Sequence, residues 1–326
     1  MKNFIKKLMV VGLCMINGAV FAAEKSQALT PQQSEQQNVL ESQCAQLSKD
    51  EGVAPVIFLF AHGLWGNKKN AEWYAPSEKN KWHLITCPYY SFNFSDVGKT
   101  KGAVKKTRVN IGQHRDIDTL TSAYDKILRD QQKKAIKQGI VLIGSSRGAV
   151  TILNTAGTQD LPRLKAIIAE APTDNVLNVI NYNLKKYHLN WSWLVGLGDY
   201  ALSKLWFTGY DPEGINPLAV VDKIDKKTPI MFIHALDDDF VSVDSSRALY
   251  YKLLESGHDD VYLLELKHGQ HGKYNLGSDA SKYEETVHAF YKKYGIPYTA
   301  ELAKKGEQYL AKCQPSLDDI ARKLGK

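Results

Sequence analysis

The sequence predicts an α/β fold in which a mostly parallel β-sheet carries helices on both faces. Short apolar runs, typical of buried strands, alternate with amphipathic segments, typical of helices. Strands that alternate with helices along a chain favour a parallel sheet over an antiparallel one. The 326 residues are enough for one large domain of this class or for two small ones.

The expected elements follow these runs in chain order. Strands are predicted over residues 56–61, 82–86, 140–143, 164–169, 230–233 and 261–266. Helices are predicted over residues 39–47, 116–137, 149–153 and 245–256, and again from residue 279 onward. About sixty residues separate the strands at 164–169 and 230–233, far more than a plain crossover needs.

We interpret residues 174–212 as a small cap inserted before the strand that begins at residue 230. This stretch is rich in aromatic residues: Trp191, Trp193, Tyr200, Trp206, Phe207 and Tyr210. These side chains could line an apolar pocket, and they could equally pack the cap onto the body of the domain.

Residues 1–22 are predicted to be a secretory signal peptide that is cleaved after Ala22. Lys2, Lys6 and Lys7 form a positive start, and the apolar run that follows is too short to span a bilayer. A retained N-terminal anchor helix is the alternative. We expect an N-terminal extension over residues 23–50, mobile at its start, and one domain over 51–326, in a protein that is periplasmic or secreted.

The formal net charge of +7 is spread along the chain, apart from one basic cluster. The cluster lies in a predicted loop and contains Lys99, Lys101, Lys105, Lys106 and Arg108. It could meet an anionic partner or simply be solvated. Because no aromatic residues alternate with the basic residues of this cluster, as base stacking would need, we expect no nucleic-acid partner. We expect neither a cofactor nor a need for membrane contact, and the oligomeric state stays open.

Residues 144–148 read GSSRG and lie between a predicted strand and a predicted helix. A G-x-S-x-G in this context is the signature of a nucleophile elbow, a tight turn that exposes a serine at the edge of the sheet. Glycine relieves the crowding because it lacks a Cβ atom. Only Ser146 has a glycine two residues away on both sides, so it is the candidate nucleophile.

Residues 234–241, HALDDDFV, follow the strand at 230–233 and resemble the I-H-G-x-x-D-x-x-V signature of the α/β-hydrolase fold. The resemblance is to the prolyl oligopeptidase-like and carboxylesterase branches, and residues 216–218 and 221–224 resemble the lead-in of those branches. It implies that Asp238 is the acid of a catalytic triad. Asp237 and Asp239 remain alternatives, and Ala235 stands where the family usually has glycine.

Residues 267–272, KHGQHG, resemble the P-G-x-G-H-G loop of the same family. The resemblance implies that His271 is the general base, with His268 as its competitor. The order serine, acid, histidine is the order found in this fold. A metal site formed by the two histidines is a further alternative, although acidic ligands at recognisable spacing are missing and we expect no metal.

Two backbone amides are candidates for the oxyanion hole, which stabilises the charge of the tetrahedral intermediate. One belongs to Arg147, directly after the nucleophile. The other belongs to Leu64, because residues 62–66, HGLWG, resemble the family's oxyanion turn. We expect His62 to brace this turn.

The sequence as a whole predicts an exported serine hydrolase of α/β-hydrolase fold that cleaves carboxylic esters through an acyl-enzyme. A serine peptidase or amidase of the prolyl oligopeptidase-like type is the second hypothesis, and a non-catalytic binding protein on this scaffold is the third. The substrate is a small ester or a peptide, and no substrate-binding residue is assigned.

An exported chain meets an oxidising compartment, so one disulfide is expected among Cys44, Cys87 and Cys313. The implied fold puts Cys44 and Cys313 near the bottom of the sheet. It puts Cys87 at the top, where the strand 82–86 would end, so we predict a Cys44–Cys313 bond.

Overall fold

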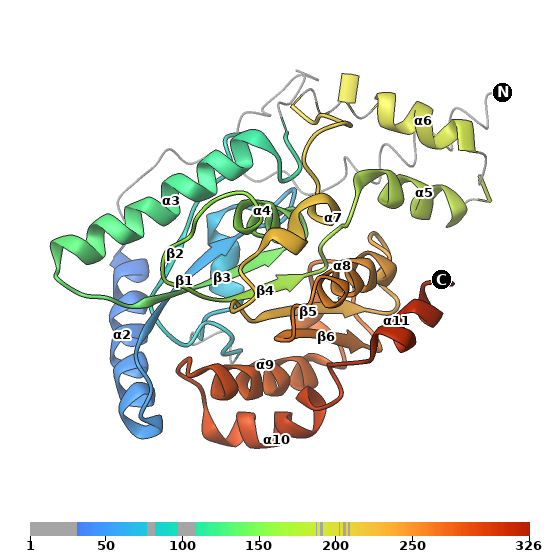
Figure 1. The fold of residues 1–326 in the computed structure, drawn as a ribbon. Helices are drawn as coiled ribbons and strands as arrows, with labels where there is room; N and C mark the ends of the chain where they lie inside the picture. Colours follow the sequence, from blue (N-terminus) through green and yellow to red (C-terminus); the bar gives the residue numbers. More distant parts are fainter. Residues whose placement is uncertain are drawn as a thin grey trace.

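A computed structural model of the chain describes residues 31–76, 82–96 and 109–326, except for 187, 190, 191, 202, 205, 206 and 208. Within these residues the chain has an α/β-hydrolase fold, with a six-stranded sheet in the order β2-β1-β3-β4-β5-β6 (Figure 1). Every neighbouring pair of strands is parallel. The predicted fold class is confirmed.

The central strands are continuous apolar runs because helices cover both faces of the sheet. The strands are β1 (Val56–Ala61), β2 (Tyr89–Ser91), β3 (Gly139–Ser145), β4 (Leu164–Glu170), β5 (Ile230–Ala235) and β6 (Val261–Leu266). One face packs on α3 (His114–Lys133), α4 (Arg147–Ala156) and α8 (Val243–Glu255). The other face packs on α9 (Ala280–Tyr294) and α10 (Ala300–Leu310).

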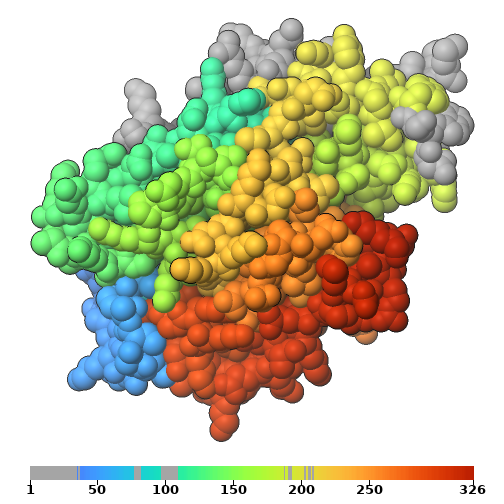
Figure 2. Space-filling view, in the orientation of Figure 1, coloured from blue at the N-terminus to red at the C-terminus, as the bar shows by residue number. Residues whose placement is uncertain are grey.

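The remaining helices and turns complete the described part of the chain. They are α2 (Pro31–Glu51), α5 (Val176–Lys186), α6 (Ser192–Ala201), α7 (Pro217–Val220), α11 (Leu317–Lys323) and the 3₁₀ turns η1 (Lys68–Trp73), η3 (Val221–Lys223) and η4 (Tyr274–Leu276). In the space-filling view α2, in blue, lies beside the C-terminal helices in red (Figure 2).

The strand register collects the functional loops at one edge of the sheet. Ser145 at the end of β3 lies opposite Glu170 at the end of β4, and Ala235 at the end of β5 lies opposite Leu266 of β6. Loops that follow parallel strands meet at the carboxyl edge, which is where open α/β sheets bind ligands. The predicted nucleophile, acid and base all follow strands that end here.

The strand predicted over residues 82–86 is wrong, because this segment is irregular and the strand β2 begins later, at Tyr89. Side chains of α9 satisfy its backbone in place of a neighbouring strand. The Tyr291 hydroxyl donates to the Leu84 carbonyl at 2.7 Å, and the His288 Nε2–H donates to the His83 carbonyl at 2.9 Å. An apolar run can therefore be buried without joining the sheet.

The predicted Cys44–Cys313 disulfide is also wrong, for the same reason. Because Cys87 precedes its strand rather than ending one, it lies at the amino end of the sheet, where α2 carries Cys44. The structure contains a Cys44–Cys87 disulfide, and Cys313 is a buried free thiol. The bond fastens α2 beside the edge strand, where the Gln37 side-chain amide pairs with both backbone groups of Tyr89.

Two helices, α5 and α6, lie between β4 and β5 in sequence and sit beyond the carboxyl ends of the strands (Figure 1). Phe207 and Tyr210 belong to a buried apolar cluster with residues of α5 and α6, whereas Trp193 and Tyr200 are exposed. Trp191 and Trp206 lie outside the described residues. The aromatic residues thus divide between packing and exposure.

The predicted signal peptide, residues 1–22, and the basic cluster of residues 99–108 both lie outside the described residues. Within the described part of the chain, no helix combines the length and apolar character that a bilayer-spanning segment needs.

We expect reduction of the Cys44–Cys87 bond to lower the free energy of unfolding by about 4 kcal/mol, since the bond closes a long loop in the unfolded chain. The 43-residue separation sets this value in a chain-entropy estimate. Urea unfolding with and without reductant measures it. Cys87→Ala should abolish the response and Cys313→Ala should retain it; the opposite pattern would contradict the assigned pairing.

Candidate functional site

Ser146 occupies the sharp turn between β3 and α4, with φ 53° and ψ −117°. A non-glycine residue with this backbone is strained and is held there by its surroundings. A Cβ atom at position 148 would lie 1.9 Å from the Ala61 carbonyl oxygen, and one at position 144 would lie 2.6 Å from the backbone of Gly148. Both glycines of the motif are therefore required by close backbone packing.

The structure brings the predicted nucleophile, base and acid into one hydrogen-bonded line. The Ser146 Oγ lies 2.8 Å from the His271 Nε2, and the His271 Nδ1 lies 2.8 Å from the Asp238 Oδ2. Asp238 is buried, whereas His271 is partly exposed. The serine is thus placed to give its proton to an imidazole that a carboxylate orients.

Burial alone would raise the pKa of Asp238, but hydrogen bonds and the nearby imidazoles lower the pKa of this carboxyl to about 2. Its Oδ2 accepts from His271 and from the Tyr274 hydroxyl, the latter at 2.5 Å. Its Oδ1 accepts from the amides of Phe240 and Val241 at 2.8 Å each. The group stays ionised because four donors replace its water shell.

The alternative residues form a separate pair. The His268 Nδ1 lies 2.9 Å from the Asp237 Oδ2, and both side chains are more than half exposed. Asp239 accepts from the His271 amide at 3.4 Å rather than from its ring. Among the described residues, no three histidine, cysteine, aspartate or glutamate side chains gather as metal ligands would.

The turn at residues 62–66 lies directly beside the elbow. A Cβ atom on Gly63 would lie 3.6 Å from the Ser146 Cβ, and the turn is closed by the Gly66 amide, which donates to the Gly63 carbonyl at 3.1 Å. Leu64 stands within this turn. The Arg147 amide lies in the first turn of α4, where helix amides lack intrahelical acceptors.

His62 links the turn to its surroundings, as expected. Its Nδ1–H donates to the Gly63 carbonyl at 2.7 Å, and its Nε2 accepts from the Phe94 amide at 3.3 Å. Burial lowers the pKa of His62 to about 4, so the ring is neutral at pH 7 and keeps one donor and one acceptor.

The side chain of Arg147 has a role that sequence reasoning missed. Its guanidinium is buried between two carboxylates, 2.7 Å from Asp116 and 2.7 Å from Asp96, and lies over the Phe94 ring at 4.3 Å. Such bidentate pairs fix a side chain in orientation as well as in place. They tie the first turn of α4 to α3 and to the loop after β2.

Glu170, at the end of β4, is a second residue that sequence reasoning missed. It is 1% exposed and accepts hydrogen bonds from the hydroxyls of Ser145, Tyr74 and Tyr283, each at 2.9 Å. Its backbone carbonyl also accepts from the Ser146 amide at 2.8 Å. Burial raises the pKa of Glu170 and the three hydroxyl donors oppose that rise. The only sequence signal was a carboxylate ending an apolar run.

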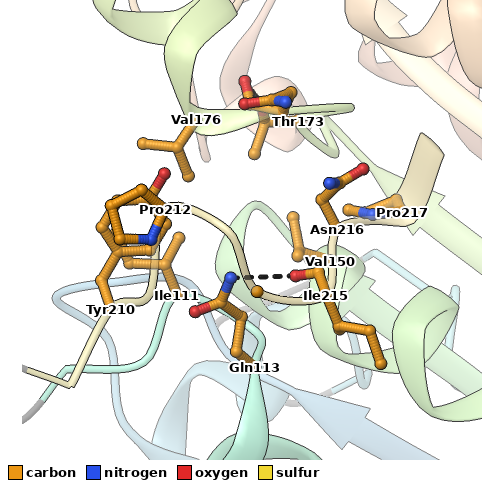
Figure 3. Close-up of a pocket in the computed structure, with 12 residues that line it drawn as sticks. Ile111, Gln113, Val150, Thr173, Val176, Tyr210, Pro212, Ile215, Asn216 and Pro217 are labelled. Atoms are coloured by element: carbon orange, nitrogen blue, oxygen red, sulfur yellow. Dashed lines mark hydrogen bonds between the residues drawn. The ribbon is translucent and has the colours of Figure 1, made fainter. Parts of the chain in front are cut away.

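A small pocket lies beside α4, where the loop 210–217 approaches Ile111, Val150 and Thr173 (Figure 3). Gln113 crosses it and donates from its Nε2 to the Ile215 carbonyl at 2.9 Å. The cavity has a volume of about 10 Å³, which is about the minimum that holds a single water molecule. The pocket is therefore too small for a substrate.

Residues 115–295 match the sequence model of the prolyl oligopeptidase family. This range contains Ser146, Asp238 and His271. The uncharacterised protein YqkD of Bacillus subtilis (strain 168) is 32% identical over 168 residues, which are 51% of this chain and 52% of that protein. The chain thus matches about half of the length of this relative.

Solved structures of related fold include the esterase Pf2001 of Pyrococcus furiosus, at 17% identity and a TM-score of 0.53. That match covers 86% of this chain and 100% of the esterase chain. An acylaminoacyl peptidase of Pyrococcus horikoshii matches at 18% identity and a TM-score of 0.50, over 83% of this chain and 40% of the peptidase. At these identities the likeness shows the fold alone.

We expect Glu170→Ala to lower the free energy of unfolding by about 3 kcal/mol or more, because three buried hydroxyls lose their acceptor. Glu170→Gln keeps an acceptor oxygen and should lose less than half as much. Urea unfolding measures both variants, with Glu301→Ala on the exposed face of α10 as the control. Equal losses for alanine and glutamine would contradict the hydrogen-bonding role.

Asp238 should make stability depend on acid pH. Because the pKa of this carboxyl is lower in the folded chain than in the unfolded chain, its stabilising contribution is complete above the unfolded value and declines as the pH falls below it. Between pH 6 and pH 3 the wild type should lose about 1 kcal/mol more than Asp238→Asn. Parallel urea titrations at both pH values test this, and parallel losses would contradict it.

Proposed function

Because the chain belongs to the prolyl oligopeptidase family and is a serine hydrolase, we propose that it cleaves carboxylic esters through Ser146, His271 and Asp238. One observation carries the proposal: the unbroken line from the Ser146 Oγ through both ring nitrogens of His271 to the buried Asp238 carboxylate. A serine hydroxyl becomes a useful nucleophile when a base accepts its proton and an acid orients that base.

The hydrogen bonds determine which nitrogen of His271 acts as the base. Since Asp238 is ionised, its Oδ2 accepts from the His271 Nδ1–H, which leaves the Nε2 lone pair facing the Ser146 hydroxyl. The four donors around Asp238 keep it an acceptor throughout. The carboxylate then stabilises the imidazolium that forms when His271 takes the serine proton.

In the proposed reaction the Ser146 Oγ attacks the ester carbonyl carbon while His271 Nε2 takes the hydroxyl proton. The amides of Leu64 and Arg147 stabilise the resulting oxyanion. When the intermediate collapses, the bond to the alcohol oxygen breaks and His271 returns the proton to that oxygen. Water then attacks the acyl-enzyme with the same base, which releases the acid and restores Ser146.

Two features of the comparisons bear on the choice between ester and peptide. The match to the esterase extends over all of that chain, whereas less than half of the acylaminoacyl peptidase is matched. This supports the ester hypothesis. A peptidase or amidase is the second candidate, because an acylaminoacyl peptidase in complex with Z-Gly-Gly-Phe-chloromethyl ketone also shares the fold.

We also propose that residues 174–212 act as a cap over this site. Two residues of α5 reach the loop that carries the acid: the Tyr182 hydroxyl donates to the Asp238 carbonyl at 2.8 Å, and the Asn183 Nδ2 donates to the Phe240 carbonyl at 2.9 Å.

Export, by cleavage of residues 1–22, is a further proposal. The Cys44–Cys87 disulfide supports it, because such bonds persist in oxidising compartments.

A fluorophosphonate probe should label the folded wild-type protein at Ser146, and peptide mapping locates the label. Ser146→Ala should lose the label and reduce ester turnover by about 10⁴-fold or more, with its circular dichroism unchanged. An unlabelled wild type without turnover would favour the non-catalytic hypothesis.

A second experiment compares the turnover of acetate esters with that of matched peptide amides, and it ranks the ester and peptidase hypotheses.

His271→Ala should reduce turnover by about 10³-fold or more, since the proton acceptor is lost. His268→Ala is the matched control, and its turnover should stay within about fivefold of wild type because an exposed ion pair contributes little. Steady-state kinetics on one ester compares the two. A larger loss in the His268 variant would move the base to that residue.

A further inference from the structure

We propose that the side chains of Trp65 and Phe240 form a binding surface for the alcohol portion of the substrate, and that this portion is apolar and preferably aromatic. The inference rests on the proposed function, because it requires His271 to protonate the leaving alcohol. It assigns a chemical class to the leaving group, which the triad itself does not specify.

The two rings form an aromatic path from the oxyanion turn to the proposed base. The Phe240 and His271 ring centroids are 5.2 Å apart, and those of Phe240 and Trp65 are 6.1 Å apart. Trp65 directly follows Leu64, whose amide is the proposed oxyanion donor. The rings therefore lie at the mouth of the site and not in the core.

The segments that carry the two rings are held in place before any substrate binds. The Phe240 amide donates to the Asp238 Oδ1 at 2.8 Å, and its carbonyl accepts from Asn183 of α5 at 2.9 Å. Leu64 and Phe240 also pack against the buried apolar cluster of the proposed cap. A preorganised surface binds with a smaller loss of side-chain entropy than a mobile one.

The position of Phe240 indicates the leaving-group side of the site. The atom that receives the proton from the His271 Nε2 is the alcohol oxygen, so the group attached to that oxygen lies next to the imidazole. Phe240 contacts this imidazole, and Trp65 extends the contact toward the oxyanion turn.

Exposure and charge indicate the chemistry of the group. Trp65 is 39% exposed, so part of its indole is left in water beside the site, where a second aromatic ring gains a favourable contact. Asp239, on the same loop as Phe240, is an exposed carboxylate, whereas Asp237 beside it is paired with His268. The negative charge of Asp239 repels an anionic alcohol, and the two rings favour an apolar one.

The test compares esters of one acid whose alcohols differ: ethyl acetate, benzyl acetate and 4-carboxybenzyl acetate. Wild type should prefer benzyl to ethyl acetate by about tenfold or more in kcat/KM, mainly through KM, and should disfavour the carboxybenzyl ester. Trp65→Ala and Phe240→Ala should each reduce the benzyl-to-ethyl ratio by about fivefold or more.

Two variants control for indirect effects. Phe240→Leu keeps an apolar side chain and should retain more of the ratio than Phe240→Ala. Leu317→Ala removes an exposed apolar side chain on α11 and should leave the ratio unchanged. Circular dichroism confirms that each variant is folded.

An unchanged benzyl-to-ethyl ratio in both alanine variants would overturn this proposal while ester turnover and Ser146 labelling persist. A second series, ethyl acetate against ethyl phenylacetate, places the aromatic group on the acyl side. If the variants alter selectivity in that series instead, the rings bind the acyl group and the proposal is wrong. Absence of both turnover and labelling would mark failure of the proposed function itself.

Discussion

The candidate site depends on the close approach of two backbones, at the point where α4 begins against the end of β1. Gly148 lies so near the Ala61 carbonyl that a side chain there would overlap it. This approach keeps Ser146 in a strained turn between β3 and α4, with its hydroxyl at the carboxyl edge of the sheet. The loops that carry Asp238 and His271 end at the same edge, so the whole hydrogen-bonded line follows from this packing.

A strained turn persists only when its surroundings over-determine it, and here buried polar groups do so. On one side, Arg147 joins α4 to two carboxylates. On the other, the Glu170 carboxylate accepts a hydrogen bond from the Ser145 hydroxyl, and the Glu170 backbone carbonyl accepts one from the Ser146 amide. Satisfied buried networks of this kind rigidify a single arrangement. Both residues thus support the turn that carries the nucleophile.

The sequence predicted most of the sheet, because β1, β3, β4, β5 and β6 are continuous apolar runs that only a covered parallel sheet buries. It failed at residues 82–86, whose apolar character reflects contact with α9 rather than strand pairing. The disulfide error followed from that failure, since a strand at 82–86 would place Cys87 at its carboxyl end, whereas Cys87 precedes β2. Hydropathy reports burial, and it does not report which partner satisfies the backbone.

The sequence by itself determined the class of the fold, the family, the candidate nucleophile and the two loops that carry the candidate acid and base, because these are encoded in short local patterns: apolar runs, GSSRG, and residues 234–241 and 267–272. The tertiary structure alone decided which of Asp237, Asp238 and Asp239 faces His271, and which histidine faces Ser146. It also revealed Glu170, the Arg147 side chain and the pairing of Cys44. These depend on contacts between residues far apart in the chain, where the folded path and not the local pattern sets the distance.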